Sequence, residues 1–570
     1  SAQAILAQAP TCLPPDPPPR QVPQAVTEAM RSSRAQSKDG HSKALLVRPN
    51  TGVAAGLLLL WSCSSRSAGA KDAFTVPKVA PRSGLQLAQA QAMGRAASRA
   101  ATLGAAEGAA GCAWKAGGFA GALALLLAAR PWPAAGKRRS RGGARAARAA
   151  LGDRRVVVTG MGITSCLGNT LDEVADSLQS GRSGITFSEE YARFGIKSQV
   201  RGRPDLTEAE IKELIPRKSL RFMGVNAQFA YIALDRALMD AGLREEEYQG
   251  NPRCASILGQ GGTSIRDVTE GVNAVESQAK RWPAKVGPYR VTRTMGSTVS
   301  AVLSSAFKLQ GPSFSISSAC STGAHCIGVG MEQIQLNKAD MALVGAGENE
   351  CWEFTAMFDC MGALSTKRND DPTRASRAFD RDRDGFVIAG GGGMLVLEEL
   401  EHAKARGARI YAELVGYAAN ADGYDVVAPS GVGGENCMKL AIAMANDIGG
   451  DRPIDYINTH GTSTPVGDVQ ELGAVKRVFA EKDFDPFVGS TKSLSGHALG
   501  AAGVHEAIYS LLMADRGFLA ESANIDDLVE EGEGLKILRE KHTGPVHRVM
   551  SNSFGFGGTN ACLIFDKWSS

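Results

Sequence analysis

The stretch Phe314-Ser-Ile-Ser-Ser-Ala-Cys-Ser-Thr-Gly-Ala-His-Cys-Ile-Gly328 places a cysteine between a strand pattern and a helix pattern. Apolar positions beyond the cysteine recur at helical spacing, namely Ile327, Met331 and Ile334. Cys320 therefore lies at the expected start of a helix, where backbone N–H groups and the helix dipole favour a thiolate. We expect Cys320 to be an exposed nucleophile. A buried structural thiol is the alternative, and it suits Cys326 better.

Strand and helix patterns alternate outward from this stretch, from residue 154 to the C-terminus. Short apolar runs predict strands at residues 156–159, 255–258, 314–317, 341–344, 394–397, 410–417, 456–458 and 561–565. Amphipathic runs predict helices at residues 171–179, 220–240, 321–336, 435–446, 466–480 and 500–514. This alternation indicates an α/β fold with a mostly parallel sheet covered on both faces. Residues 155–162 and residues 409–417 each lead from an expected strand into a turn that contains glycine. This similarity indicates an internal duplication.

Two histidines and a lysine follow in small-residue contexts. Asn458-Thr-His-Gly-Thr-Ser-Thr-Pro-Val-Gly-Asp468 places His460 after an expected strand, in a loop whose hydroxyls suit a polar ligand. Ser490-Thr-Lys-Ser-Leu-Ser-Gly-His497 places Lys492 and His497 before a small-residue helix. Either histidine alone is more often a structural hydrogen-bonding residue. Metal ligation is a further alternative, but zinc sites usually draw on short-spaced ligand pairs, so we predict no metal.

Two glycine-rich stretches complete the pattern. Ser551-Asn-Ser-Phe-Gly-Phe-Gly-Gly-Thr-Asn560 precedes the last strand, and its glycines let backbone N–H groups face an oxyanion. The tract 390–393 invites a phosphate-loop interpretation, but no Lys-Ser/Thr follows and the dinucleotide-binding spacing is absent. Tight backbone packing is the better prediction for that tract.

Together these stretches resemble the β-ketoacyl-acyl-carrier-protein synthases over roughly residues 154–566. The matching motifs are Ser317-Ser-Ala-Cys-Ser-Thr-Gly-Ala-His-Cys-Ile-Gly328, Asp384-Gly-Phe-Val-Ile-Ala-Gly-Gly-Gly-Gly393, His460-Gly-Thr-Ser-Thr-Pro-Val-Gly-Asp468 and Ser551-Asn-Ser-Phe-Gly-Phe-Gly-Gly-Thr-Asn560. The resemblance implies a thiolase-like fold, a layered α-β-α-β-α sandwich of two similar halves. Residues 151–407 would carry the nucleophile and residues 408–570 the two histidines. A homodimer is the usual assembly of this family.

The resemblance also implies an acyltransferase that needs no cofactor. An acyl group would pass from the phosphopantetheine arm of an acyl carrier protein to Cys320. Malonyl-carrier protein would then lose carbon dioxide and condense with it, giving a 3-oxoacyl chain in fatty acid synthesis. His460 and His497 match the pair that donates hydrogen bonds to the enolate, and Phe556 matches the gating aromatic residue. The backbone N–H groups of Cys320 and Phe556 would form the second oxyanion hole.

Further site residues follow from the resemblance. Lys492 matches the active-site lysine and is expected to pair with Glu471. Thr462 and Thr464 match hydroxyls that contact the phosphopantetheine arm. The substrate-binding residues are completed by Phe554 and Gly262. Gly262 falls where synthase II enzymes tend to carry a larger side chain, so we expect it to leave room in the acyl pocket.

The sequence around Cys320 resembles that of synthase I more than that of synthase II, and so does the segment Cys351-Trp-Glu353. Synthase II and a polyketide ketosynthase are the alternative enzymes. The alternative from another class is a non-catalytic, carrier-binding chain-length partner, in which the nucleophile is replaced. The intact Cys320 argues against that alternative.

Charge is divided unevenly along the chain. Residues 1–150 hold 20 Lys and Arg against 5 Asp and Glu, whereas the rest of the chain holds 43 against 54. A mildly acidic remainder argues against nucleic acid as a partner. An acidic carrier protein would still need local basic residues, for which Arg217 and Lys218 are candidates. Eleven cysteines without a CxxC pair indicate reduced thiols.

Residues 1–150 have the composition of a targeting leader, rich in Ala, Arg, Gly, Ser and Pro. An apolar run at 53–61 is typical of a signal peptide. A second run at 118–129 is short for a membrane span and precedes the basic cluster 137–148. This order resembles the multipartite plastid leaders of algae with secondary plastids. We expect a plastid location, with a mitochondrion as the alternative, and no stable membrane span in the mature protein.

Overall fold

The computed structural model describes residues 154–277, 281–480 and 485–569. The leader predicted over residues 1–150 lies outside the described residues, and its targeting signals stay predictions. Within the described ranges, no helix combines the length and the apolar character that crossing a membrane requires.

Five strands form the first half of the main sheet: β1 (Val156–Thr164), β4 (Cys254–Gly259), β5 (Ser313–Ile316), β6 (Met341–Glu348) and β7 (Gly391–Glu399). Their order across the sheet is β5-β4-β6-β7-β1. β4 runs parallel to β5 and β6, whereas β7 runs antiparallel to both β6 and β1. The first strand of this half therefore lies at one edge of the half and the third strand at the other.

The second half repeats this plan with β8 (Ala412–Ala421), β9 (Tyr456–Asn458), β10 (Phe487–Gly489), β14 (Arg548–Gly555) and β15 (Thr559–Lys567). Their order is β10-β9-β14-β15-β8, with the same parallel and antiparallel pairings, and β12 (Lys536–Ile537) extends the edge beyond β10. The repeated order confirms the predicted duplication. β1 and β8 join the halves into an eleven-stranded sheet through two residue pairs, Val157 with Glu413 and Val158 with Ala412.

The sheet is mixed, so the prediction of a mostly parallel sheet is wrong. The last strand of each half runs antiparallel to both of its neighbours in the sheet. In the second half β14 and β15 form a hairpin whose turn contains Gly557 and Gly558, both at positive φ. The predicted strands all exist in the structure, but β10, β12 and β14 of the main sheet were not predicted.

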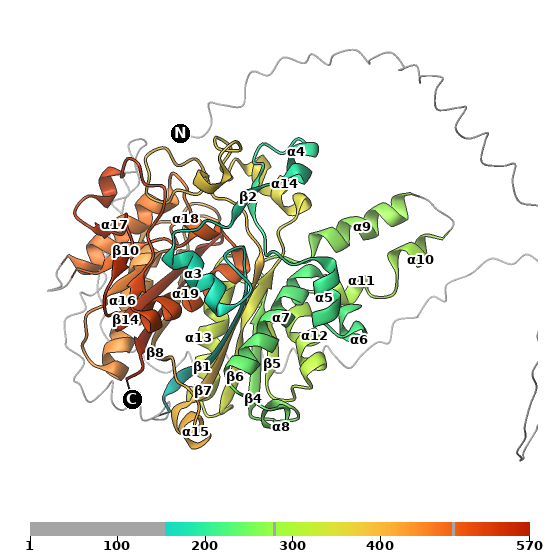
Figure 1. Ribbon diagram of the computed structural model, residues 1–570, viewed down its shortest axis with the longest axis horizontal. Coiled ribbons are helices and arrows are strands. Elements are labelled where there is room, and N and C mark those ends of the chain that lie inside the picture. Colours follow the sequence, from blue (N-terminus) through green and yellow to red (C-terminus); the bar gives the residue numbers. More distant parts are fainter. Residues whose placement is uncertain (1–153, 278–280, 481–484, 570) are drawn as a thin grey trace, which may run out of the picture. The chain divides into compact units, whose positions relative to one another are not determined.

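Six helices complete five layers, which confirms the α-β-α-β-α sandwich (Figure 1). α7 (Val225–Asp240) and α12 (Thr298–Phe307) cover the outer face of the first half, and α16 (Val432–Gly449) and α17 (Gly467–Phe479) that of the second. Between the halves lie α13 (Thr322–Gln335) and α19 (Ala502–Arg516), which also contact each other. The first-half and second-half helices occupy equivalent places after equivalent strands.

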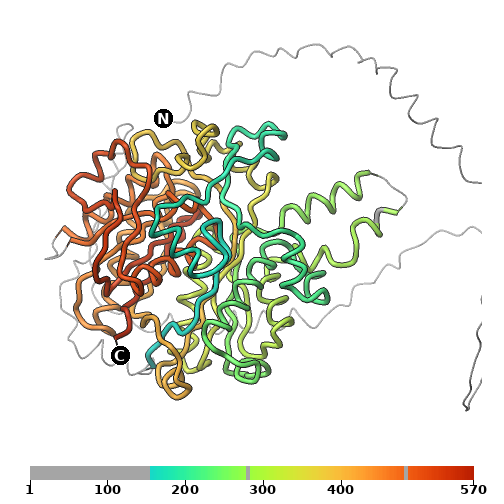
Figure 2. The backbone as a smooth tube through the Cα atoms, in the orientation of Figure 1, coloured from blue at the N-terminus to red at the C-terminus, as the bar shows by residue number. Residues whose placement is uncertain are grey.

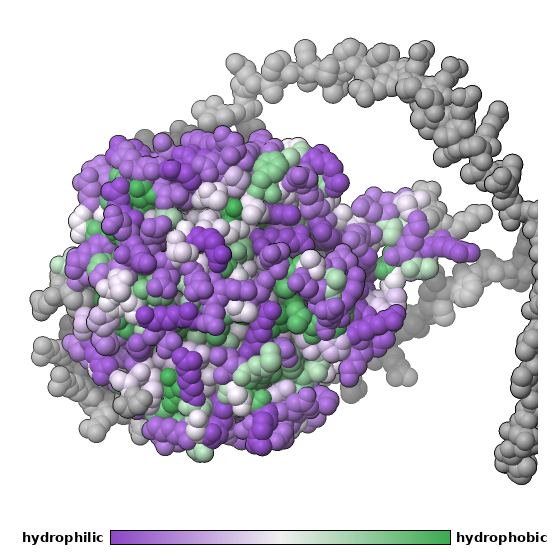
Figure 3. Space-filling view, viewed as in Figure 1, coloured by the Kyte–Doolittle hydropathy of each residue, from purple (hydrophilic) through white to green (hydrophobic). Residues whose placement is uncertain are grey.

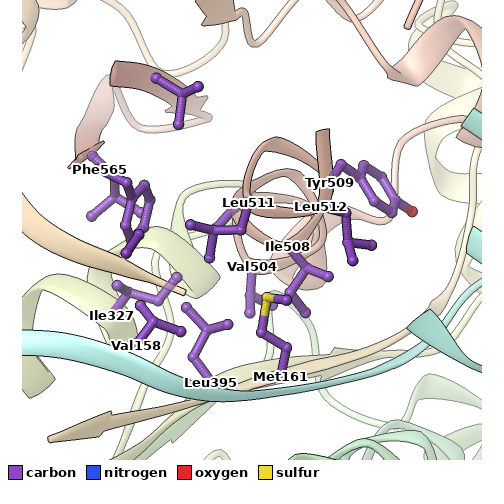
Figure 4. Packing of buried hydrophobic residues seen from close by; sticks show 14 of the residues in the cluster. Val158, Met161, Ile327, Leu395, Val504, Ile508, Tyr509, Leu511, Leu512 and Phe565 are labelled. Atoms are coloured by element: carbon purple, nitrogen blue, oxygen red, sulfur yellow. The ribbon is translucent and has the colours of Figure 1, made fainter. Parts of the chain in front are cut away.

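The central layer is apolar because sheets cover it from both sides (Figure 4). Side chains of α13 and α19 meet side chains from β1 and β7 of the first half and β15 of the second. All of the following are at most 2% exposed: Met161, Ile327, Leu395, Val504, Ile508, Leu511 and Phe565. Because these two helices are buried on all sides, their positions between the sheets are fixed. Both helices begin at the same edge of the sheet, and this edge carries the site.

The glycine tract at the start of β7 lies between α7 and α19. A Cβ atom on Gly392 would lie 2.6 Å from the backbone of Phe229 on α7, and one on Gly393 would lie 2.9 Å from Val504 on α19. The tight backbone packing predicted for this tract is confirmed.

Segments between the main strands cover the ends of the sheet. Near the start of the described chain, α3 (Leu171–Gln179) crosses to pack on α19 of the other half, the cyan and red segments of Figure 2. α9 (Ile265–Glu276), α10 (Trp282–Val286) and α11 (Arg290–Thr294) project together from the first half (Figure 1). The other elements are β2 (Ile185–Phe187), α4 (Glu189–Arg193), β3 (Val200–Gly202), α5 (Glu208–Leu214), α6 (Arg217–Leu220), α8 (Glu245–Tyr248), α14 (Trp352–Met361), α15 (Leu400–Ala405), α18 (Lys492–Ser495), β11 (Phe518–Leu519) and β13 (His542–Thr543).

Candidate active site

Three residues that are far apart in the sequence meet at one edge of the sheet. Cys320 follows β5 and precedes α13, His460 follows β9, and His497 lies between α18 and α19. The sulfur of Cys320 and one ring nitrogen from each histidine lie within 4.8 Å of one another. The predicted grouping of Cys320 with both histidines is therefore what the structure contains.

The turn that carries Cys320 is tied to the β14–β15 hairpin. Ala319 has a φ of 49°, an unfavourable value for a residue with a side chain. The Ser321 hydroxyl has one proton to donate and lies within hydrogen-bond distance of two carbonyl oxygens, those of Ser553 (3.0 Å) and Thr559 (2.8 Å). The backbone N–H groups of Phe556 and Cys320 both interact with the Cys320 sulfur. Two N–H donors thus converge beside the sulfur, as an oxyanion hole requires.

The resting form of Cys320 differs from the prediction. Burial raises the pKa of the Cys320 thiol to about 12, with a smaller contribution from Glu348, while Lys492 and the two N–H groups oppose the rise. The prediction of an exposed cysteine held as a thiolate by the helix start is therefore wrong. Cys320 is only 8% exposed, and burial outweighs the nearby positive charge and N–H groups that favour its charged form.

The two histidines are neutral at physiological pH. Their rings lie edge to face, with centroids 5.2 Å apart. Burial lowers the pKa of both well below the ordinary value, and the Lys492 ammonium lowers both further. A neutral imidazole carries one N–H donor and one acceptor nitrogen. Each ring can therefore donate a hydrogen bond, and each can also accept a proton.

Lys492 pairs with Glu506 on α19, not with Glu471 as predicted. Both partners of the ion pair are 2% exposed. Glu471 instead accepts hydrogen bonds from the backbone N–H groups of His460 (2.9 Å) and Gly461 (2.8 Å). Glu471 therefore holds the His460 loop, while Glu506 balances the charge of Lys492.

Glu506 was missed in the sequence, although a signal existed. It is a charged residue in the small and apolar helix pattern of residues 500–514, where an acid needs a partner. Burial raises the pKa of Glu506 to about 7, and the ion pair with Lys492 opposes that rise.

A cavity of about 380 Å³ opens onto the three residues. Among the predicted site residues it is lined by Cys320, His460, His497, Glu471, Thr462, Thr464, Phe554 and Phe556. The hydroxyls of Thr462 and Thr464 lie 3.1 Å apart in its wall. Phe358 and Phe386, which were not predicted, supply further aromatic lining.

Lys492 and Gly262 do not line this cavity. Lys492 is 2% exposed and is held in its ion pair with Glu506. A Cβ atom on Gly262 would lie 2.9 Å from Cζ of Phe354, so the space at this glycine is filled by an aromatic ring. The prediction that Gly262 leaves open room in the acyl pocket is therefore wrong, because Phe354 occupies that room.

The same trio could in principle bind a metal ion. Cys320, His460 and His497 offer one thiol and two imidazoles, which are ligands that Zn²⁺ accepts, and no other group of this kind is found among the described residues. The cluster is also fully equipped for acyl transfer without a metal, since a nucleophile, two neutral imidazoles and two N–H donors surround one cavity.

Comparison with known proteins agrees with this arrangement. The model for the N-terminal domain of β-ketoacyl synthases matches residues 153–403, and the model for the C-terminal domain matches residues 411–526. The 3-oxoacyl-[acyl-carrier-protein] synthase 1 of Escherichia coli K12 is 54% identical over 414 residues, covering 73% of this chain and 99% of that protein. The synthase 2 of Vibrio harveyi is 39% identical over 424 residues, with the same coverage of both chains.

Among solved structures, a β-ketoacyl synthase from Burkholderia phymatum STM815 superposes with a TM-score of 0.68 at 34% identity, covering 73% of this chain and all of that one. Fold, site and sequence lead to one conclusion: the chain belongs to the β-ketoacyl synthase family.

Proposed function

We propose that this protein is a 3-oxoacyl-acyl-carrier-protein synthase of type I, which condenses acyl-carrier and malonyl-carrier substrates in fatty acid synthesis. The observation that carries the proposal is a buried cysteine and two neutral histidines that share one cavity. Identity to the synthase 1 of Escherichia coli exceeds identity to the synthase 2 of Vibrio harveyi, 54% against 39%, which favours type I.

In the first half-reaction the Cys320 sulfur attacks the carbonyl carbon of the acyl thioester. Because the resting thiol holds its proton, a base must take that proton, and a neutral imidazole lies within reach. The N–H groups of Cys320 and Phe556 stabilise the oxyanion of the tetrahedral intermediate. The carbon–sulfur bond to the carrier then breaks, and the phosphopantetheine thiolate leaves with the proton.

In the second half-reaction malonyl-carrier protein occupies the same cavity. Its carboxylate leaves as carbon dioxide, and the electron pair of the broken bond moves into the thioester as an enolate. N–H donors of His460 and His497 stabilise the enolate oxygen. The enolate carbon attacks the acyl-Cys320 carbonyl, and the carbon–sulfur bond to Cys320 breaks. The Cys320 thiolate that leaves takes up one proton from solvent, which balances the charge of the lost carboxylate.

Lys492 supports both steps through its charge. Its ammonium lowers the pKa of both histidines, and Glu506 keeps that ammonium buried. The histidines thereby keep an acceptor nitrogen for the thiol and a donor N–H for the enolate. Thr462 and Thr464 line the part of the cavity that we assign to the phosphopantetheine arm.

We assign recognition of the carrier protein to exposed cations on α6. Arg217 and Lys218 are exposed there, and Arg221 at its end is exposed as well. They do not line the cavity, so they would bind the surface of the carrier and not its arm. Such charges favour encounter with an acidic partner.

Replacing the nucleophile tests the proposed function. The full-length Cys320→Ala protein should form no acyl-enzyme and no 3-oxoacyl product, because no other group can hold the acyl chain. The measurement is mass spectrometry of protein and product after mixing with acyl-carrier and malonyl-carrier substrates. Cys326→Ala, which changes a buried thiol on α13, the helix that follows Cys320, is the control and should retain both. Condensation by Cys320→Ala, or loss of wild-type activity with a chelator, would refute the proposed mechanism.

Removing one enolate donor tests the role of the histidines. His460→Ala should slow malonyl decarboxylation about 100- to 1,000-fold, the usual effect of losing one oxyanion-hole donor. The exposed His547, changed to Ala, is the control and should not alter the rate. In the wild type the rate should stay constant as pH falls from about 8 to about 6, because the lowered pKa values keep both imidazoles neutral there. A decline centred near the ordinary histidine pKa would contradict neutral donors.

We also propose that two copies pair along β5. β5 ends the sheet, so one side of its backbone lacks a strand partner among the described residues, and Phe314 on it is 42% exposed. Apolar side chains are exposed at helical spacing on nearby projecting α9: Val268, Val272 and Val275. The projecting part carries both hydrophobic and hydrophilic residues, on a molecular face that is otherwise mainly hydrophilic (Figure 3).

The pairing predicts a dimer that Phe314→Glu weakens, because a charge would be buried at the junction. Sedimentation of wild type and variant over a concentration series checks this, with exposed Leu440→Glu on α16 as the control. A monomeric wild type, or a variant with an unchanged dissociation constant, would exclude this edge as the interface.

We propose a plastid location from the composition and order of segments in residues 1–150. A fluorescent protein carrying residues 1–150 should enter plastids of an alga with secondary plastids. Accumulation in mitochondria would contradict the plastid location and favour the mitochondrial alternative.

A further inference from the structure

We propose that Arg383 positions the two threonines to which we assign the phosphopantetheine arm. The inference rests on the proposed function, because it concerns the arm of the acyl-carrier substrate. Arg383 is not among the residues that line the cavity, whereas Thr462 and Thr464 are. Arg383 is therefore a positioning residue, which acts on the substrate only through the loop that carries these threonines.

Two segments that are distant in the sequence form neighbouring parts of the cavity wall. Residues 384–386 line the cavity from the first segment, and residues 464–467 line it from the second. The backbone N–H of Gly385 donates to the carbonyl oxygen of Ser463 (3.0 Å), which joins the two segments directly. Arg383 belongs to the first segment, and its side chain extends to the second.

Each nitrogen of the Arg383 guanidinium donates to a backbone carbonyl oxygen. Nε donates to Thr464 (3.0 Å), Nη2 to Pro465 (2.7 Å) and Nη1 to Asp380 (2.8 Å). Arg383 is only 8% exposed. Because a planar guanidinium presents its N–H groups in fixed directions, these bonds set where the carbonyls of residues 464 and 465 lie relative to the first segment.

Asp468, in the first turn of α17, holds the N–H groups of the same loop. Its carboxylate accepts from the backbone N–H of Thr464 (3.2 Å) and of Phe379 (3.0 Å), and it lies 3.5 Å from Nε of Arg383. Burial raises the pKa of Asp468 to about 6, and the charge of Arg383 is the largest of the effects that oppose this rise. Arg383 thus helps to keep this buried carboxylate charged, and a charged carboxylate is the stronger acceptor.

The loop between the two threonines has an unfavourable backbone that needs such support. Ser463 has a φ of 69°, in the left-handed region that residues with a side chain rarely adopt. A conformation of this kind persists only where the surrounding structure holds it. With the loop held, the hydroxyls of Thr462 and Thr464 lie 3.1 Å apart in the cavity wall. Without Arg383 we expect the loop to relax and the two hydroxyls to move apart.

The experiment compares full-length wild type, Arg383→Gln and Arg383→Lys. Each protein is acylated with two thioesters of the same acyl group, one on phosphopantetheine and one on ethanethiol, which has no arm. Arg383→Gln should raise KM for the phosphopantetheine thioester about tenfold, because the threonines are misplaced. Its acylation by the ethanethiol thioester, and the alkylation of its Cys320 by iodoacetamide, should stay within about twofold of the wild-type rates.

The conservative variant separates positioning from loss of the fold. Arg383→Lys keeps the charge beside Asp468 but offers its N–H donors from a single nitrogen, so its KM should lie between those of wild type and Arg383→Gln. If Arg383→Gln does not fold, Arg383→Lys supports the same comparison of the two thioesters.

A double-mutant cycle tests whether Arg383 acts through the threonines. Replacing both threonines, Thr462→Val with Thr464→Val, should itself raise KM for the phosphopantetheine thioester. Adding Arg383→Gln to this pair should cause no further rise, because the effects of residues that act as a unit are not additive. A further rise as large as that of Arg383→Gln alone would overturn the role assigned to Arg383.

Arg548→Gln is the matched control. Arg548 is also a buried arginine, 2% exposed and paired with Asp566 (2.5 Å), but it does not line the cavity. The control should lower the melting temperature and leave both thioester reactions unchanged, which shows the effect of losing a buried ion pair elsewhere in the same half.

The outcomes are distinguishable. If wild type forms acyl-Cys320 but folded Arg383→Gln and Arg383→Lys keep its KM for the phosphopantetheine thioester, the role of Arg383 is overturned and the proposed function stands. Equal losses with the two thioesters overturn it as well. If wild type forms no acyl-Cys320 from acyl-carrier protein, the proposed function itself is overturned, and the role of Arg383 with it.

Discussion

Burial of α13 and α19 between the two half-sheets is the constraint on which the site depends. Each helix is enclosed by strands on two sides and by the other helix on a third, so neither can shift without exposing its apolar faces. Both helices begin at the same edge of the sheet. Cys320 precedes one and His497 precedes the other, and their distance is therefore set by core packing and not by the loops that carry them.

The electrostatics of the site follow from the same burial. An isolated cysteine at a helix start tends towards a thiolate, and an isolated histidine titrates near neutrality. In this interior the thiol keeps its proton and both imidazoles stay neutral. The Lys492 ammonium, which acts on all three residues, is balanced by its ion pair with Glu506. Cys320 and both histidines are thus uncharged in the resting site, which suits a reaction whose negative charge appears only transiently.

Much of this could be predicted from the sequence, and the failures have identifiable causes. Long apolar strands and amphipathic helices were found, whereas β10, three residues long, and β14, which carries Ser and Asn inside a buried strand, gave no usable pattern. The motifs predicted which residues surround the cavity. They pointed to Glu471 as the partner of Lys492 and missed Glu506, because the packing of α19 decides which acid Lys492 meets. Phe354 was invisible for the same reason, since the space beside Gly262 is a tertiary property.

The matching order of strands in the two halves explains why the site draws its residues from both of them. Cys320 follows the third strand of the first half and His497 follows the third strand of the second, at topologically equivalent positions. A polypeptide that contained only one half would carry either the nucleophile or the two imidazoles, but not both. The first half supplies the nucleophile and the second half supplies the imidazoles. The two similar halves therefore have different roles in one reaction.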